Sequence, residues 1–138
     1  MTTLAAVGPA LPVAQADITL TGHAIEARLY AEDPYANFAP QTGPIRWWRP
    51  GWALSAGVRI DDGIVEGGEV SPWYDPMVAK LIVHGRDRDD AIRRLRAALA
   101  ATPLLGLRNN ARFLRDLLDH PTFRRGETTT AWLDEAQA

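Results

Sequence analysis

Apolar and polar positions alternate between residues 18 and 31, which predicts a half-buried strand near the start of the chain. Gly22 is expected to mark a bend or bulge within this strand. The side chains expected on its apolar face are those of Ile18, Leu20, Ile25, Ala27 and Leu29. Those expected on its polar face are Ala24, Glu26, Arg28 and Tyr30. A polar strand face is either hydrated or functional, so this face is the first candidate for chemistry.

Three further segments have the pattern of strands. Residues 77–84 form the clearest apolar run, and residues 58–60 predict a strand that ends at the Asp-Asp-Gly turn after it. Residues 45–49 predict one more short strand, because a Pro-Gly turn follows them directly. Residues 18–85 are therefore expected to build a sheet.

The hydrophobic period changes from two to about 3.6 after residue 85, which predicts helices for the second half. Asp87 is the expected N-cap of a first helix that runs to about Ala101. A second helix is expected to start near Asn109 or Asn110, and a short last helix covers about 129–135. Strands followed by helices predict an α+β domain, with an antiparallel sheet that helices cover on one side.

The ends of the chain differ in composition from its middle. Residues 1–17 are rich in alanine and proline and carry no charge before Asp17, so we expect a linker or N-terminal connecting segment there. The predicted domain covers residues 18–138. The proline-rich start favours excision from a longer chain over an independent beginning at Met1.

The composition excludes several classes of protein. A chain of 138 residues with 46% hydrophobic residues and a net charge of −2 is typical of one compact domain with its own core. The charge gives no electrostatic reason to bind nucleic acid or an anionic membrane, and no apolar run approaches the ~20 residues of a membrane span. With no cysteine and no signal-peptide pattern, the expected compartment is the reducing cytoplasm.

Few residues offer chemistry by themselves. The three histidines lie far apart without metal-ligand spacing, so no metal site is predicted, and no phosphate-binding glycine loop is present. What remains is Glu26 and Arg28 on one strand face and Arg59 on another predicted strand. An arginine suits bicarbonate, carboxylate, phosphate or a developing oxyanion. The alternative is a structural Arg–Glu pair, and spacing alone does not decide between the two.

Longer motifs carry a resemblance to a known family. Residues 22–34 read GHAIEARLYAEDP, and residues 74–81 read YDPMVAKL. Together with Val-Arg-Ile-Asp at 58–61, Asp-Arg at 87–88 and Trp-Leu at 132–133, they follow the order and spacing of the biotin carboxylase C-terminal domain. The chain resembles that domain over about residues 18–134. The sequences of these motifs are most similar to those of carboxylases of propionyl-type or branched acyl-CoA substrates.

The resemblance implies roles for five residues. Arg28 matches the family's catalytic arginine, which lies beside biotin and stabilises its enolate, so it is also the expected cofactor-binding residue. Glu26 is expected to orient Arg28. Arg59 matches an arginine near the subunit contact of homodimeric members, and Tyr74 and Asp75 are expected in a loop close to that contact.

The resemblance also implies the function. The chain would form part of the biotin and bicarbonate site of a biotin carboxylase subunit, the ATP-dependent ligase component of an acyl-CoA carboxylase. ATP and Mg²⁺ would bind the family's preceding ATP-grasp part, so this chain is not expected to be active alone. Expected partners are that ATP-grasp part, a biotin carboxyl carrier domain, a carboxyltransferase subunit and a second copy in a dimer. The alternative is a stand-alone, non-enzymatic module that binds a carrier or partner subunit.

Overall fold

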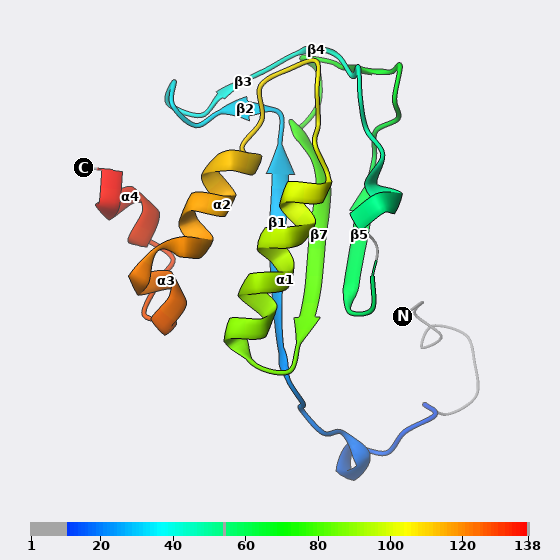
Figure 1. The fold of residues 1–138 in the computed structure, drawn as a ribbon, viewed down its shortest axis with the longest axis vertical. Coiled ribbons are helices and arrows are strands. Elements are labelled where there is room, and N and C mark those ends of the chain that lie inside the picture. Colours follow the sequence, from blue (N-terminus) through cyan, green and yellow to red (C-terminus); the bar gives the residue numbers. More distant parts are fainter. Residues whose placement is uncertain (1–10, 54, 138) are drawn as a thin grey trace.

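An antiparallel sheet of three strands forms the centre of the molecule (Figure 1). The computed structural model describes residues 11–53 and 55–137. The sheet has the order β1-β7-β5, and its strands are β1 (His23–Tyr30), β7 (Met77–Gly85) and β5 (Val58–Asp62). Two small ladders lie at one end of it: β2 (Glu32–Asp33) pairs with β3 (Ala39–Pro40), and β4 (Gly43–Pro44) pairs with β6 (Glu69–Val70). Because β7 lies between the other two strands, β1 is an edge strand.

The helices follow the strands in sequence. They are α1 (Arg88–Ala101), α2 (Ala111–Asp119), α3 (Pro121–Arg125) and α4 (Trp132–Gln137), and short 3₁₀ turns occur at Gln15–Asp17 and Pro50–Ala53. Figure 1 shows α1 lying across β1 and β7, whereas α2 and α3 continue beyond the free edge of β1. The predicted α+β class, with helices on one side of an antiparallel sheet, is confirmed.

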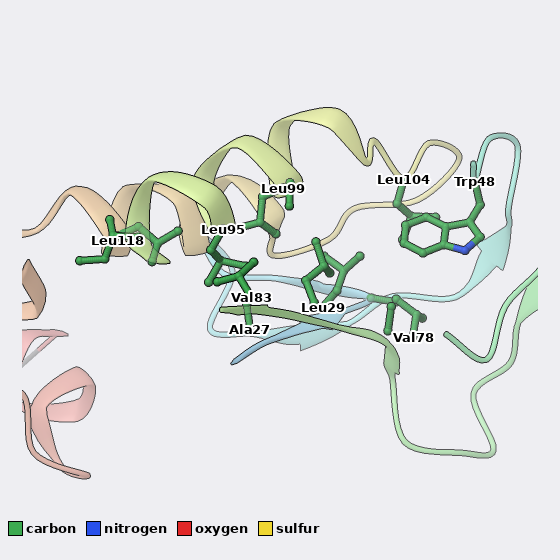
Figure 2. Close-up of a cluster of buried hydrophobic side chains, with 14 of the residues drawn as sticks. Ala27, Leu29, Trp48, Val78, Val83, Leu95, Leu99, Leu104 and Leu118 are labelled. Carbon is green, nitrogen blue, oxygen red and sulfur yellow. The ribbon is translucent and has the colours of Figure 1, made fainter. Parts of the chain in front are cut away.

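The core lies between α1 and the face of the sheet that α1 covers (Figure 2). Burial along β1 alternates as its period-two pattern predicts, burial along β7 alternates from Ala79 onward, and Leu81 on this central strand is 0% exposed. The helix contributes an apolar stripe at helical spacing. The buried side chains that share this interface are Ala27, Leu29, Ala79, Leu81, Val83, Ala91, Ile92, Leu95, Ala98 and Leu99.

The turn from β7 into α1 shows why this helix begins where the sequence predicts. The Asp87 carboxylate accepts from the Asp90 backbone N–H at 2.8 Å, which is an N-cap bond. A Cβ on Gly85 would lie 2.4 Å from the Ala91 backbone nitrogen, so the strand end and the helix start can approach only with glycine there. The buried Asp90 carboxylate accepts from the Arg86 backbone N–H, and this bond lowers its pKa.

Two predictions of local structure are wrong. Ile18 and Leu20 do not belong to the first strand: both are exposed, and β1 begins only at His23 after Gly22, whose φ is +72°. Residues 45–49 do not form a strand, because after β4 only an isolated bridge joins Trp47 to Leu105. The second predicted helix, α2, ends at Asp119, and Pro121 then begins α3 in the first turn, where a helix does not need the N–H that proline lacks.

The N-terminal segment is only partly described. Residues 1–10 of the expected connecting segment 1–17 lie outside the described residues, and residues 11–17 are exposed. The domain boundary at residue 18 therefore stays a prediction. In the described part of the chain, no helix has the length and apolar character needed to cross a membrane.

Replacing Leu81 with alanine tests the core. Leu81→Ala should lower the free energy of unfolding by about 2–5 kcal/mol, because it removes buried methyl groups and leaves a cavity under α1. Urea denaturation of the chain, followed by circular dichroism, measures this loss. The matched control is Leu20→Ala at a side chain that is 98% exposed, which should change stability by less than about 0.5 kcal/mol. Equal effects of the two variants would contradict the placement of the core.

Candidate functional site

The sheet face opposite α1 carries charged side chains in two cross-strand rows. Register pairs Arg28 of β1 with Lys80 of β7, and Lys80 with Asp61 of β5. The next row pairs Glu26 with Ile82 and Ile82 with Arg59. Directly paired residues of neighbouring strands point to the same side of a sheet. Glu26, Arg28 and Arg59 therefore lie on one face, which the alternation of the sequence predicted for Glu26 and Arg28.

Arg28 is held in place from its own strand. Its Nε donates to Oε1 of Glu26 at 3.1 Å, and the two side chains are 61% and 39% exposed. The bond to Glu26 raises the pKa of Arg28, and the Tyr30 side chain raises it further. Residues two apart on a strand share a face, so both neighbours flank the guanidinium. An arginine has five N–H donors and Glu26 takes one, which leaves a fixed cation that faces solvent.

Arg59 has the same kind of partner on β5. Its Nε donates to Oδ1 of Asp61 at 2.8 Å, and this bond lowers the pKa of the Asp61 carboxyl. The two arginines do not form one site, because β7 separates their strands. They also line different hollows: Arg28 lines a pocket beside α2, whereas Arg59 lines a shallow one with Ile82 and His84.

The pocket next to Arg28 is mostly apolar. Its volume is about 290 Å³, which is close to the lower end for small-molecule sites. Its polar walls come from the β1 edge of the sheet and from the start of α2: Glu26, Arg28, Tyr30, Glu32 and Asn110. Its apolar walls come largely from the helices: Phe113, Leu114, Leu117, Phe123 and Leu133. Such a pocket can take a ligand with an apolar body and a polar group that meets the guanidinium of Arg28.

The loop before β7 lies at the Glu32 end of the sheet. Tyr74 is 84% exposed, and Asp75 accepts from the Met77 backbone N–H at 2.7 Å. Partial burial raises the pKa of Glu32, and the nearby Asp75 carboxylate raises it further. Arg59 pairs with Ile82 of β7. Ile82 lies five residues from Met77, the first residue of β7 after this loop, which is roughly 16 Å at the rise of a strand. The structure thus brings Asp75, which follows Tyr74, close to Glu32 and not to Arg59.

Two residues near Arg28 were missed by sequence reasoning. Lys80 could have been placed on the exposed face by its parity in the apolar strand, but only the register sets it opposite Arg28. Asn110 was expected only as a possible helix start, yet its side chain binds the backbone of Arg28 and Tyr30. These contacts cross about 80 positions of sequence, so no local signal could have revealed them.

Metal ligands do not gather at this site. Within residues 11–53 and 55–137, no group of three or more His, Cys, Asp or Glu side chains is placed to hold a metal ion. The chemistry that the described residues offer is therefore that of a positioned cation beside an apolar pocket.

Comparison with known proteins gives this geometry a family. The profile of the biotin carboxylase C-terminal domain matches residues 26–135. The chain is 41% identical to the propionyl-CoA carboxylase alpha chain of Ruegeria pomeroyi, over 94% of this chain and 22% of the relative. It is 46% identical to a biotin carboxylase of Halalkalibacterium halodurans, over 94% of this chain and 28% of the relative.

Solved structures agree with the sequence relatives. The biotin carboxylase domain dimer of the 2-oxoglutarate carboxylase of Hydrogenobacter thermophilus, in complex with MgADP and bicarbonate, superposes with a TM-score of 0.87. It is 34% identical, and the match covers 94% of this chain and 28% of that one. The chain thus spans less than a third of the length of these relatives. Its fold, its motifs and the match over residues 26–135 show that it belongs to the biotin carboxylase C-terminal domain family.

Proposed function

We propose that this chain forms one wall of the biotin site in the biotin carboxylase component of an ATP-dependent acyl-CoA carboxylase. The observation that carries the proposal is the exposed Arg28 guanidinium, which Glu26 holds at 3.1 Å beside a pocket of about 290 Å³. Arg28 is the proposed catalytic and cofactor-binding residue, and Glu26 is the proposed residue that orients it. The family and the propionyl-CoA carboxylase alpha chain of Ruegeria pomeroyi support the reaction class.

The described residues fit biotin. Biotin supplies a ureido nitrogen that receives the carboxyl group. Arg28 offers N–H donors and a permanent charge to an oxygen that gains negative charge, which is how a fixed cation stabilises a transition state. Glu26 keeps the guanidinium from turning away, and the apolar walls of the pocket exclude water from its far side. The residues of this chain thus bind, orient and stabilise charge.

The described residues do not fit ATP and Mg²⁺. No cluster of carboxylates able to hold a metal occurs in the part of the chain that the structure covers, and the sequence has no phosphate-binding glycine loop. The solved relative from Hydrogenobacter thermophilus binds MgADP with a chain of which the present one covers 28%. We propose that ATP and Mg²⁺ bind an ATP-grasp part outside this sequence. We assign no step of phosphoryl transfer to the present chain.

The proposed partners follow from the same assignment. They are the ATP-grasp part of the same subunit, a biotin carboxyl carrier domain and a carboxyltransferase subunit. A dimer is proposed with Arg59, Tyr74 and Asp75 at or near the contact, and the solved relative from Hydrogenobacter thermophilus, itself a biotin carboxylase domain dimer, supports it. The cytoplasm stays the expected compartment, with which a chain free of cysteine is compatible.

Removal of the Arg28 side chain tests the proposed function. In the carboxylase subunit that contains this chain, Arg28→Ala should lower the turnover of biotin carboxylation by about 10²-fold or more, because the fixed cation is lost. Binding of ATP should survive. The matched control is Arg125→Ala, at an arginine that is 57% exposed and also pairs with a carboxylate two residues away, Glu127 at 2.8 Å. The control should keep its turnover.

Two outcomes would contradict the proposal. Unchanged turnover in Arg28→Ala would remove this arginine from the catalytic machinery. An antibody against this domain that detects only a 15.2 kDa band in the source cells would favour the stand-alone binding module. A much larger band that also binds streptavidin would support a biotin-containing carboxylase subunit. A large band without biotin would support a carboxylase with a separate carrier protein.

A second variant separates the role of Glu26 from that of Arg28. Glu26→Gln keeps the size of the side chain but removes its charge, so the guanidinium stays present and loses its charged partner. Turnover should fall by about 10-fold, which is less than in Arg28→Ala, with the KM for ATP unchanged. Glu127→Gln, the partner of Arg125, is the matched control and should have no effect. A full rate in Glu26→Gln, with Arg28→Ala impaired, would show that Arg28 needs no such partner.

Charge reversal at Arg59 tests the proposed dimer contact. Arg59→Glu replaces the cation with a carboxylate that lies beside the carboxylate of Asp61 on an exposed strand. This variant should raise the dissociation constant of the dimer by about 10-fold or more. Light scattering across a concentration series of the carboxylase subunit measures this constant. Arg125→Glu carries the same charge change on α3 and should leave the dimer intact. If both variants dimerise like the wild type, Arg59 does not belong to the contact.

A further inference from the structure

The buried amide of Asn110 does not serve the helix that it precedes. Asn110 is the N-cap residue of α2 and is 4% exposed, yet its side chain makes no capping bond to that helix. Asparagine at this position usually accepts from a backbone N–H of the first helical turn. Because an unpaired polar group in the interior costs free energy, a buried amide that makes no hydrogen bond to its own helix needs other partners.

Those partners are on the edge of β1, at the residues around the site. Oδ1 of Asn110 accepts from the Tyr30 backbone N–H at 2.9 Å, and its Nδ2 donates to the Arg28 carbonyl at 3.1 Å. Its backbone N–H donates to the Tyr30 carbonyl at 3.2 Å. A neighbouring strand would use the same donor and acceptor pattern. With these three hydrogen bonds, Asn110 takes the place of a neighbouring strand at the free edge of β1.

The position of this contact matters because the regular ladder fails there. β1 and β7 pair in register from His23 to Leu29, and the register then shifts between Leu29 and Tyr30. A bulge of this kind weakens pairing and changes the direction of the strand. Arg28 lies directly before the shift and Tyr30 directly after it. The hydrogen bonds from Asn110 thus hold residues 28–30 from the free edge of β1, at the point where the pairing with β7 is irregular.

We propose that Asn110 is a positioning residue for Arg28, which sets the backbone of residues 28–30 so that the guanidinium lies over its pocket. The inference rests on the proposed function of Arg28. Asn110 also lines the pocket, but both polar atoms of its amide bond to the backbone of β1, so in this proposal it acts through the strand and is not a catalytic residue. The same contacts hold the backbone of Tyr30, whose side chain flanks the guanidinium.

The test uses the next residue as its control. Asn109 has the same side chain, but its amide binds Leu104, Leu107 and Ala111 within its own loop and helix start. Asn110→Asp keeps the shape and the acceptor and sets a carboxylate oxygen against the Arg28 carbonyl. In the carboxylase subunit, below the melting midpoint of each variant, Asn110→Asp should lower kcat by about 10- to 100-fold with the KM for ATP unchanged. Asn109→Asp should keep its kcat.

A double variant separates positioning from stability. In the Arg28→Ala background, Asn110→Asp should cause no further loss of kcat, because residues that act through one group are not additive. A merely structural role would give the same fractional loss in both backgrounds and would overturn the inference. A normal kcat in the folded single variant, with Arg28→Ala impaired, would also overturn it. If Arg28→Ala itself has full turnover, the proposed function fails instead.

A measurement on the unaltered chain covers the case in which Asn110→Asp does not fold. The Arg28 carbonyl points away from β7, so by alternation the Glu26 N–H points to the same free edge, where the described residues offer it no partner. Amide hydrogen exchange followed by NMR should therefore be at least about 10-fold slower at Tyr30 than at Glu26. Equal exchange rates would show that Asn110 does not hold the strand in solution and would overturn the inference.

Discussion

The packing of α1 on one face of β1 and β7 is the constraint on which the rest of the structure depends. A strand alternates its side chains, so once Ala27 and Leu29 are buried beneath the helix, Glu26 and Arg28 must lie on the other side. Slippage of β1 by one residue would bury both charges and expose the apolar set. The free energy of the core thus fixes the face on which the site stands, although no core residue takes part in its chemistry.

The charges of the exposed face are organised by pairing rather than by burial. Arg28 with Glu26 and Arg59 with Asp61 are each neighbours two residues apart on one strand, and each pair stays largely solvated. Exposed pairs of this kind contribute little to stability, typically under about 1 kcal/mol. Their physical effect is to restrict long side chains to a few orientations. For a residue that must present a cation to a ligand, this restriction matters more than the energy of the pair.

The edge of β1 shows how distant parts of the chain complete the site. Its pocket takes polar walls from the first strand and apolar walls from helices that begin some 80 residues later. The same helical region supplies Asn110, whose amide stands in for a missing strand. An edge strand with unpaired backbone groups is prone to fray or to pair with other chains. Covering its last residues with a side chain leaves the open face accessible and the backbone fixed.

The sequence by itself determined the elements whose pattern is local. Period-two alternation predicted the two faces of β1, an apolar run predicted β7, helical spacing predicted α1 and α2, and Asp87 marked a cap. The motifs around Arg28 predicted the family and the residue on which the proposed chemistry depends. Local patterns suffice there because burial on one face imposes the same period on sequence and structure.

Only the tertiary structure decided the rest. Ile18 and Leu20 continue the alternation of β1, but no strand pairs with them, so they lie outside the sheet. Register alone sets Lys80 opposite Arg28, and chain folding alone brings Asn110 to the strand edge. The physical reason is the same in each case. Hydrogen bonds between distant segments depend on which backbones meet, and a local pattern of apolar residues carries no information about that.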